Sequence, residues 1–204
     1  MKERSIPCKD PEVKAIIDGQ QTMIRRAIKP QPNYGQEFIG MSFVWDGKSQ
    51  AEFETPPLFP GASMYHPLCP YGQPGDRLWV KEEWGVAPCN NSFPPSEIPL
   101  SSARHVDYKA DEERYWSVHV DKWRPSIFMP RWASRITLEI VDVWVERLQE
   151  ITDEDIWNEG AIFNKGIESY HAQSKFKALW DFTNGKEYPW KNNPWVWCIK
   201  FKKL

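Results

Sequence analysis

Residues 19–26, GQQTMIRR, carry the first side chains whose types could bind or transform a ligand. Thr22 offers a hydroxyl, while Arg25 and Arg26 offer fixed positive charge. Two arginines in a turn are also typical of a solvated surface, because exposed charge is the usual case. Farther along, Glu159 in the segment ITDEDIWNEGAI offers a carboxylate that could activate water or accept a hydrogen bond from an amino group.

Residues 122–135, KWRPSIFMPRWASR, interleave basic and aromatic side chains. Single-stranded nucleic acid is bound by this combination, since cations contact phosphates and flat rings stack on bases. The segment therefore predicts a nucleic-acid surface, whose candidate residues are Lys122, Arg124, Arg131, Trp132 and Arg135. Other lysines could extend this surface, although a basic strand end is often only a solubility device; they are Lys29, Lys200, Lys202 and Lys203.

Glu82 and Trp84, in the segment VKEEW, are further candidates for the same surface. Glu82 could instead pair with an arginine and have no other role. A tryptophan is more often a core or loop anchor than a platform for a base. Each of these two residues could therefore stabilise the fold instead of binding a ligand.

The four cysteines are scattered and contain no C-x-x-C pair. His66 near Cys69 is the only hint of metal ligands, and its spacing matches no common zinc site. We therefore expect free thiols, no metal and no cofactor.

Composition limits the class of protein. A chain of 204 residues can bury a real core in one domain, and a net charge of −2 means that any nucleic-acid surface is a local patch. Eighteen prolines and twelve tryptophans predict stiffened loops over a strand-rich core. No apolar run approaches the roughly 20 residues of a membrane span. The N-terminal MKERSIP lacks a signal-peptide core, so we expect no membrane partner and a cytoplasmic location.

A short helix and a strand are expected to position Arg25 and Arg26. Asp10 is a suitable N-cap for the helix, and Gly19 is the expected C′ residue with a left-handed backbone. Residues 20–26 would then form a loop that leads into a strand at 26–28. Pro30 would end that strand, because proline cannot donate to a ladder.

Alternation of apolar and polar residues predicts further strands at residues 43–45, 78–82, 114–120, 135–148 and 195–201. The longest of them shifts its alternation near Val141 and Asp142, as a β-bulge would. Residues 31–74 and 86–113 otherwise read as loops rich in proline and polar residues.

Two helices are expected in the C-terminal half. Thr152 and Asp155 form a capping-box-like start for a short helix that ends at Gly160. A second, amphipathic helix at residues 170–182 would have as its core face Phe176, Leu179 and Trp180. This order of elements predicts an α+β fold with a small mixed or antiparallel barrel and helices at its ends.

Four segments resemble the ASCH-domain proteins, particularly those of phages and prophages; they are IIDGQQTMIRR, YGQPGDRLWVKEEW, WRPSIFMPRWASRITLEIVDVWVERLQEIT and NPWVWCIKFKKL. The ASCH fold belongs to the PUA-like β-barrels. The resemblance implies a single such domain over residues 1–204, with insertions at about 31–70 and 86–121 that lie outside it.

The ASCH signature is G-x-K-x-x-[E/T]-x-R, and Gly19 and Arg26 match its ends. Gln21 stands at the signature lysine, and Ile24 stands at the glutamate or threonine. In the similar bacterial N4-acetylcytidine amidohydrolase, the lysine and threonine act with a glutamate that aligns with Glu159. Glutamine cannot titrate and isoleucine has no oxygen. The resemblance therefore implies a pocket that binds RNA or a modified nucleoside with weak or no catalysis.

Two other functions stay open. One is a hydrolase of N4-acylated cytidine or of RNA that uses Glu159 with Glu82 or Thr22. The other is a phage interaction module that acts on a host factor through the insertions. Phe128, which stands where the family commonly has histidine, removes another candidate acid and favours binding over either reaction.

Overall fold

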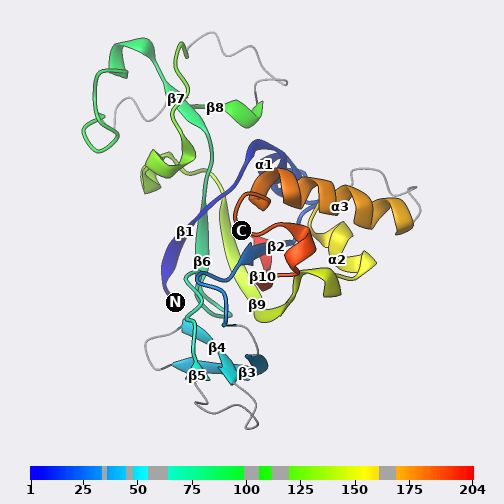
Figure 1. Ribbon diagram of the computed structural model, residues 1–204. Helices are drawn as coiled ribbons and strands as arrows, with labels where there is room; N and C mark the ends of the chain where they lie inside the picture. The colour runs from blue at the N-terminus through cyan, green and yellow to red at the C-terminus, as the bar shows by residue number, and fades with distance from the viewer. Residues whose placement is uncertain (34–35, 45–47, 55–63, 99–105, 112–119, 161–168) are drawn as a thin grey trace.

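The computed structural model has an α+β architecture (Figure 1) and describes residues 1–33, 36–44, 48–54, 64–98, 106–111, 120–160 and 169–204. Its main body is a five-stranded sheet in the order β1-β6-β9-β10-β2. A three-stranded sheet, β3-β4-β5, and a strand pair, β7-β8, extend from opposite ends of this body (Figure 1).

The main sheet consists of β1 (Glu3–Pro7), β6 (Arg77–Lys81), β9 (Thr137–Arg147), β10 (Trp195–Lys203) and β2 (Met23–Ala27). β1 runs parallel to β6, and the other neighbouring pairs are antiparallel. The edge strands β1 and β2 do not pair with each other in the described chain, so the sheet is open. The expected closed barrel is therefore not formed by these strands.

A β-bulge changes the register between β9 and β10, as the sequence predicts. Asp142 pairs with Lys200, but the next pair joins Ile140 to Phe201, which leaves Val141 without a partner in the ladder. Val141 is 48% exposed, whereas Ile140 is buried. Because a slip of one residue reverses the two faces of a strand, the bulge keeps the apolar side chains of both halves of β9 toward the core.

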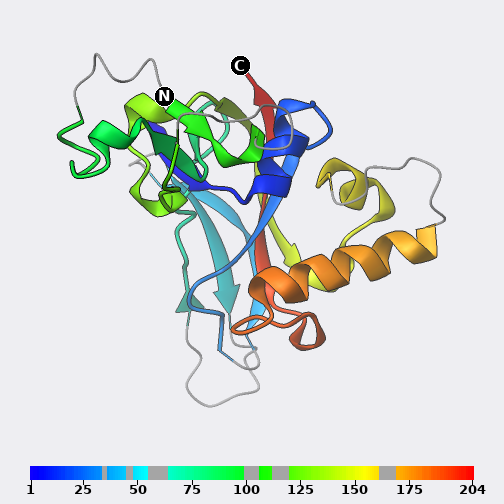
Figure 2. The same cartoon turned by 90° about the horizontal axis from the view of Figure 1, so that it is seen from above.

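Two apolar clusters cover opposite faces of the sheet. β10 contributes Trp197 and Ile199 to one cluster, and Val196 and Cys198 to the other. The helix α1 (Asp10–Ile17) and the strand β4 pack into the first cluster. The helices α2 (Asp153–Asn158) and α3 (Ser169–Asn184) cover the second, and Figure 2 shows them together on one side of the sheet.

The connection from α1 to β2 differs from the prediction in two details. Lys9 is the N-cap of α1, so Asp10 is the first helical residue. Gly19 has a φ of +70°, which confirms the left-handed helix end. β2 begins at Met23, so the prediction of a loop through residues 20–26 was wrong. Pairing with β10 extends this strand toward the helix.

The insertions contain more strands than the sequence indicated. β3 (Glu37–Val44), β4 (Lys48–Glu54) and β5 (Met64–Tyr65) form an antiparallel sheet, and β7 (Trp84–Val86) pairs with β8 (Val106–Tyr108). The missed signal is the alternation in KSQAEFE, whose Ala51 and Phe53 are buried. The 3-10 turns that connect the elements are η1 (Pro88–Asn90), η3 (Lys109–Asp111), η4 (Ser126–Phe128), η5 (Arg131–Ala133), η6 (Leu148–Glu150) and η7 (Trp190–Asn192).

The C-terminal helices follow the prediction except at one core position. Thr152 caps α2, because its side-chain oxygen accepts a hydrogen bond from the Asp155 backbone N–H at 3.1 Å. In α3, Phe176 and Trp180 are buried, but Leu179 is 39% exposed and was wrongly placed in the core.

Three further expectations concern the whole chain. The four cysteines are free thiols, as predicted. Within the described residues, none of the helices is long and apolar enough to cross a membrane. The strand expected at residues 114–120 lies almost entirely outside the described residues.

Candidate functional site

The two faces of β2 separate the residues that the sequence grouped into one pocket. Side chains alternate along a strand, so Met23 and Arg25 lie on one face, and Ile24 and Arg26 lie on the other. Ile24 is fully buried in the first apolar cluster. The expectation that Ile24 lines a pocket with Glu159 was therefore wrong.

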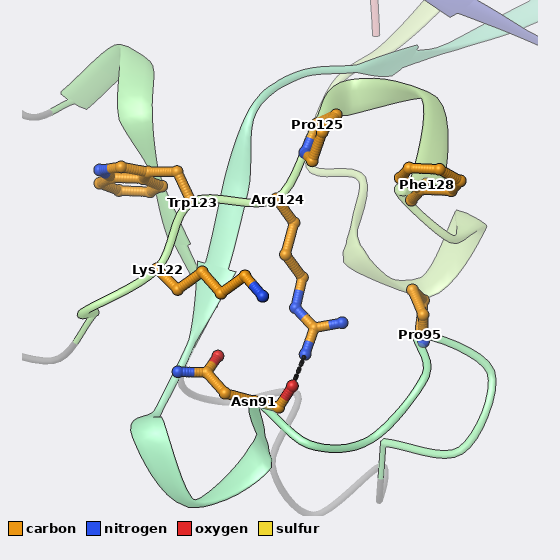
Figure 3. Close-up of a pocket in the computed structure, with 7 residues that line it drawn as sticks. All are labelled: Asn91, Pro95, Lys122, Trp123, Arg124, Pro125 and Phe128. Carbon is orange, nitrogen blue, oxygen red and sulfur yellow. Dashed lines mark hydrogen bonds between the residues drawn. The ribbon is translucent and has the colours of Figure 1, made fainter.

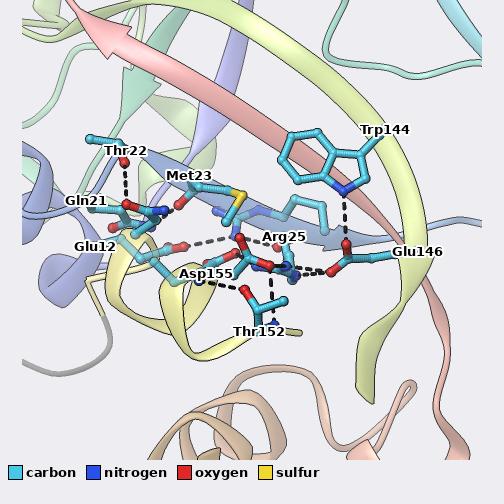
Figure 4. Close-up of polar contacts among 12 residues, drawn as sticks. Glu12, Gln21, Thr22, Met23, Arg25, Trp144, Glu146, Thr152 and Asp155 are labelled. Atoms are coloured by element: carbon cyan, nitrogen blue, oxygen red, sulfur yellow. Dashed lines mark hydrogen bonds and ion pairs between the residues drawn. The ribbon is translucent and has the colours of Figure 1, made fainter. Parts of the chain in front are cut away.

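Arg25 is the centre of a buried cluster of acidic side chains (Figure 4). Its own side chain is fully buried, and its guanidinium contacts carboxylates from β9, α2 and the residue that ends α2. Nε donates to Glu146 at 2.9 Å, Nη2 donates to Asp155 at 2.9 Å, and Nη1 donates to Glu159 at 3.0 Å. One cation thus faces three carboxylates and ties α2 to the sheet. Sequence reasoning missed Glu146 and Asp155 as members of this cluster.

Glu159 is the most buried acid of this cluster. Its side chain is 8% exposed, and burial raises its pKa to about 7, although the attraction of Arg25 opposes this rise. Gln21 lies beside it, because the two residues form an isolated antiparallel bridge. The Gln21 amide donates to the Met23 carbonyl at 3.0 Å, and its oxygen has no hydrogen-bond partner among the described residues. The predicted proximity of Gln21 and Glu159 is confirmed.

Thr22 joins the end of α2 to the start of β2. Its backbone N–H donates to the Asn158 carbonyl at 2.8 Å, and its hydroxyl lies 3.3 Å from the Asn158 amide oxygen. Thr22 thus lies beside the carboxylate cluster, and its hydroxyl is directed to an amide rather than to Glu159. The cluster contains a carboxyl group suited to proton transfer near neutral pH, but its glutamine cannot act as a base.

Arg26 lies on the other face of the sheet from Glu159. Its Nη1 donates to Glu12 at 2.9 Å, and its Nη2 donates to the Pro7 carbonyl at 3.0 Å. The guanidinium also lies near Cys8, whose thiol pKa is raised by burial. Arg25 is therefore the arginine in direct contact with Glu159, while Arg26 acts on this carboxylate only through its charge.

Glu82 and Arg135 form an ion pair in which the carboxylate is fully buried and the arginine reaches the surface. Glu82 is fully buried and accepts hydrogen bonds from Arg135 Nε at 3.0 Å and Nη2 at 2.9 Å. Arg135 also contacts Asp111, and its guanidinium lies 3.9 Å from the centre of the Tyr108 ring. Burial raises the pKa of Glu82, against the effect of Arg135. The structural reading of Glu82 as an arginine partner is confirmed.

The predicted basic and aromatic segment is divided between structural and exposed side chains. Trp84 is fully buried and meets Trp132 edge-on, with ring centres 5.8 Å apart, so neither ring is an open platform. Arg124 lies over the Trp84 ring and donates to the carbonyl oxygens of Asn90, Asn91 and Phe93 at 3.1 to 3.2 Å. Arg124 therefore anchors this loop.

A hollow of about 230 Å³ lies beside this anchor (Figure 3). Its walls are mainly apolar, and Lys122 stands at its rim; the lining residues are Asn91, Pro95, Lys122, Trp123, Arg124, Pro125 and Phe128. Phe128 is 60% exposed, and Lys122 is exposed. The sequence analysis identified Lys122 and Arg124 and singled out Phe128 in the same segment, but it missed Asn91 and Pro95, which the contacts of Arg124 with the loop at residues 90–93 bring to them.

Arg131 is half-exposed and pairs with Glu3 at 3.2 Å. It therefore lies on the surface of β1 and β6, outside the lining of the hollow. No group of three potential metal ligands occurs among the described residues. Comparison of the chain with protein-family models, with curated proteins and with solved structures found no match.

Proposed function

We propose that this protein is an ASCH-type, PUA-like protein that binds single-stranded RNA or a nucleoside, with one base in the hollow lined by residues 91, 95, 122–125 and 128. The hollow carries the proposal, because it combines an exposed ring with a cationic rim. Phe128 offers a flat face, and Lys122 offers a charge for phosphate. Its volume is below the roughly 300–1,000 Å³ of pockets for larger ligands, so it suits a single base.

The ASCH part of the proposal is supported at two positions of the signature, Gly19 and Gln21. Gly19 has the backbone that the helix end requires, and Gln21 lies next to Glu159 as the resemblance implies. The carboxylate is held by Arg25, and the neighbouring glutamine has no titratable group. These contacts favour binding over catalysis.

Fluorescence anisotropy with a labelled single-stranded RNA at low salt tests the binding proposal. Phe128→Ala removes the exposed ring, so we expect affinity to fall by about 1–3 kcal/mol, the usual value of one stacked base. Phe182→Ala is the matched control, because Phe182 is 85% exposed on α3, away from the hollow. An equal loss in both variants, or no binding by the unchanged protein at micromolar concentration, would contradict the proposal.

One observation favours a second function, hydrolysis of N4-acylated cytidine or of RNA. The pKa of Glu159 is about 7, which suits a general acid or base at neutral pH. Incubation with N4-acetylcytidine and with RNA distinguishes the two functions. Product formation that is lost in Glu159→Gln would replace the binding proposal by the enzymatic one.

A further inference from the structure

The outer face of β6 carries polar and aromatic side chains close to the hollow. Leu78 and Val80 are fully buried, so alternation along the strand directs Arg77, Trp79 and Lys81 to the opposite face. This face is continued by β1, whose residues pair in parallel register with those of β6.

Trp79 lies between two cationic groups. The Lys81 ammonium nitrogen is 5.4 Å from the centre of its ring, and the Arg131 guanidinium carbon is 5.9 Å from it. An aromatic ring flanked by cations is the combination that holds bases and phosphates of a single strand. We call Trp79, Lys81 and Arg131 the β6 strip.

The two cations of the β6 strip are open to competition from an anion. Lys81 donates to the Ile127 carbonyl at 2.7 Å, and this acceptor carries no negative charge. Arg131 pairs with Glu3, but the two side chains are 44% and 41% exposed. Exposed pairs of this kind are weak and are screened by salt, so a phosphate can replace the carboxylate.

The β6 strip is continuous with the hollow through η4. Lys81 contacts the carbonyl of Ile127, and the next residue, Phe128, lines the hollow. Ile127 is 67% exposed, so the path between the two sites runs over the surface. A ligand longer than one nucleotide can therefore reach both.

We propose that the β6 strip binds the phosphate backbone of the single-stranded RNA whose base occupies the hollow, an inference that rests on the proposed function. Lys81 and Arg131, which flank the Trp79 ring, contact successive phosphates. A nucleoside contacts the hollow alone. Affinity for RNA therefore depends on strand length and on salt, while affinity for cytidine depends on neither.

The double variant Lys81→Gln, Arg131→Gln tests this assignment. Each phosphate contact with a single strand contributes a slope of about −0.7 to the logarithm of affinity against the logarithm of salt concentration. Loss of two contacts should make the slope shallower by about 1.4 for an RNA of about eight nucleotides. Cytidine binding, measured by competition, should stay unchanged.

The matched control is Lys175→Gln, Lys177→Gln, which removes the same charge from exposed positions of α3. Figures 1 and 2 place α3 away from β1 and β6. An unchanged slope in the β6 variant, or an equal change in the control, overturns the β6 strip and leaves the hollow intact. A normal response to Phe128→Ala in the same assay identifies that outcome, whereas absence of all binding overturns both proposals.

Discussion

Replacing Glu159 by glutamine tests whether the protein holds this carboxylate at a cost in stability. Burial raises its pKa from 4.5 to about 7, despite the attraction of Arg25. The folded protein therefore binds the proton more tightly than the unfolded chain. The stability that this group contributes is present below about pH 4.5 and is lost as the pH rises through about 7. The full rise corresponds to roughly 3 kcal/mol, at about 1.36 kcal/mol per pH unit.

The Arg25 guanidinium keeps two carboxylate partners when Glu159 is replaced by glutamine. Glu146 from β9 and Asp155 from α2 still contact its guanidinium after Glu159 becomes neutral. Glu12, from α1, also raises the pKa of Glu159, while Arg26 lowers it. We therefore expect Glu159→Gln to increase the free energy of unfolding by about 1–3 kcal/mol at about pH 8, and to leave it nearly unchanged below about pH 4.5.

Urea unfolding followed by tryptophan fluorescence, repeated between about pH 4.5 and 8, measures this difference. Glu146→Gln is the control, because Glu146 accepts hydrogen bonds from both Arg25 and the Trp144 indole. Its loss should destabilise the protein by about 1–3 kcal/mol. A Glu159→Gln protein that is less stable than the unchanged chain at pH 8, or that keeps its pH dependence, would contradict a raised pKa of Glu159.

Two further substitutions test the packing of the β7 region. Arg135→Met leaves the fully buried Glu82 without its cation and should lower the free energy of unfolding by about 3–5 kcal/mol, measured by urea unfolding; a loss below about 1 kcal/mol would show that solvent reaches Glu82. Gly85→Ala places a methyl group 2.3 Å from a methyl carbon of Val120, so we expect a loss of about 1–3 kcal/mol and a lower melting temperature. An unchanged melting temperature would show that Val120 moves aside freely.

The sequence predicted correctly those features that depend on residues close together in the chain. The left-handed turn at Gly19 and the cap at Thr152 depend on neighbours within a few residues. The bulge at Val141 is visible because a break in alternation marks it directly. In the first insertion only a short strand at residues 43–45 was expected, which overlaps the end of β3. The rest of β3 and the strands β4 and β5 were missed, because Pro, Gly and polar residues dominate that segment and the burial of Phe53 depends on contacts with Trp195, far along the chain.

The sequence, through its resemblance to the ASCH signature, predicted that an arginine and Glu159 belong to the part of the protein around Gln21, and the bridge between Gln21 and Glu159 agrees with this. Only the tertiary structure decided which arginine faces the carboxylate. Pairing with β10 starts β2 at Met23, and this register directs Arg25 toward Glu159 and Arg26 toward Glu12. Side chains alternate with a period of two, so adjacent residues with the same chemistry take opposite faces. Long-range pairing, which no local pattern records, assigns those faces.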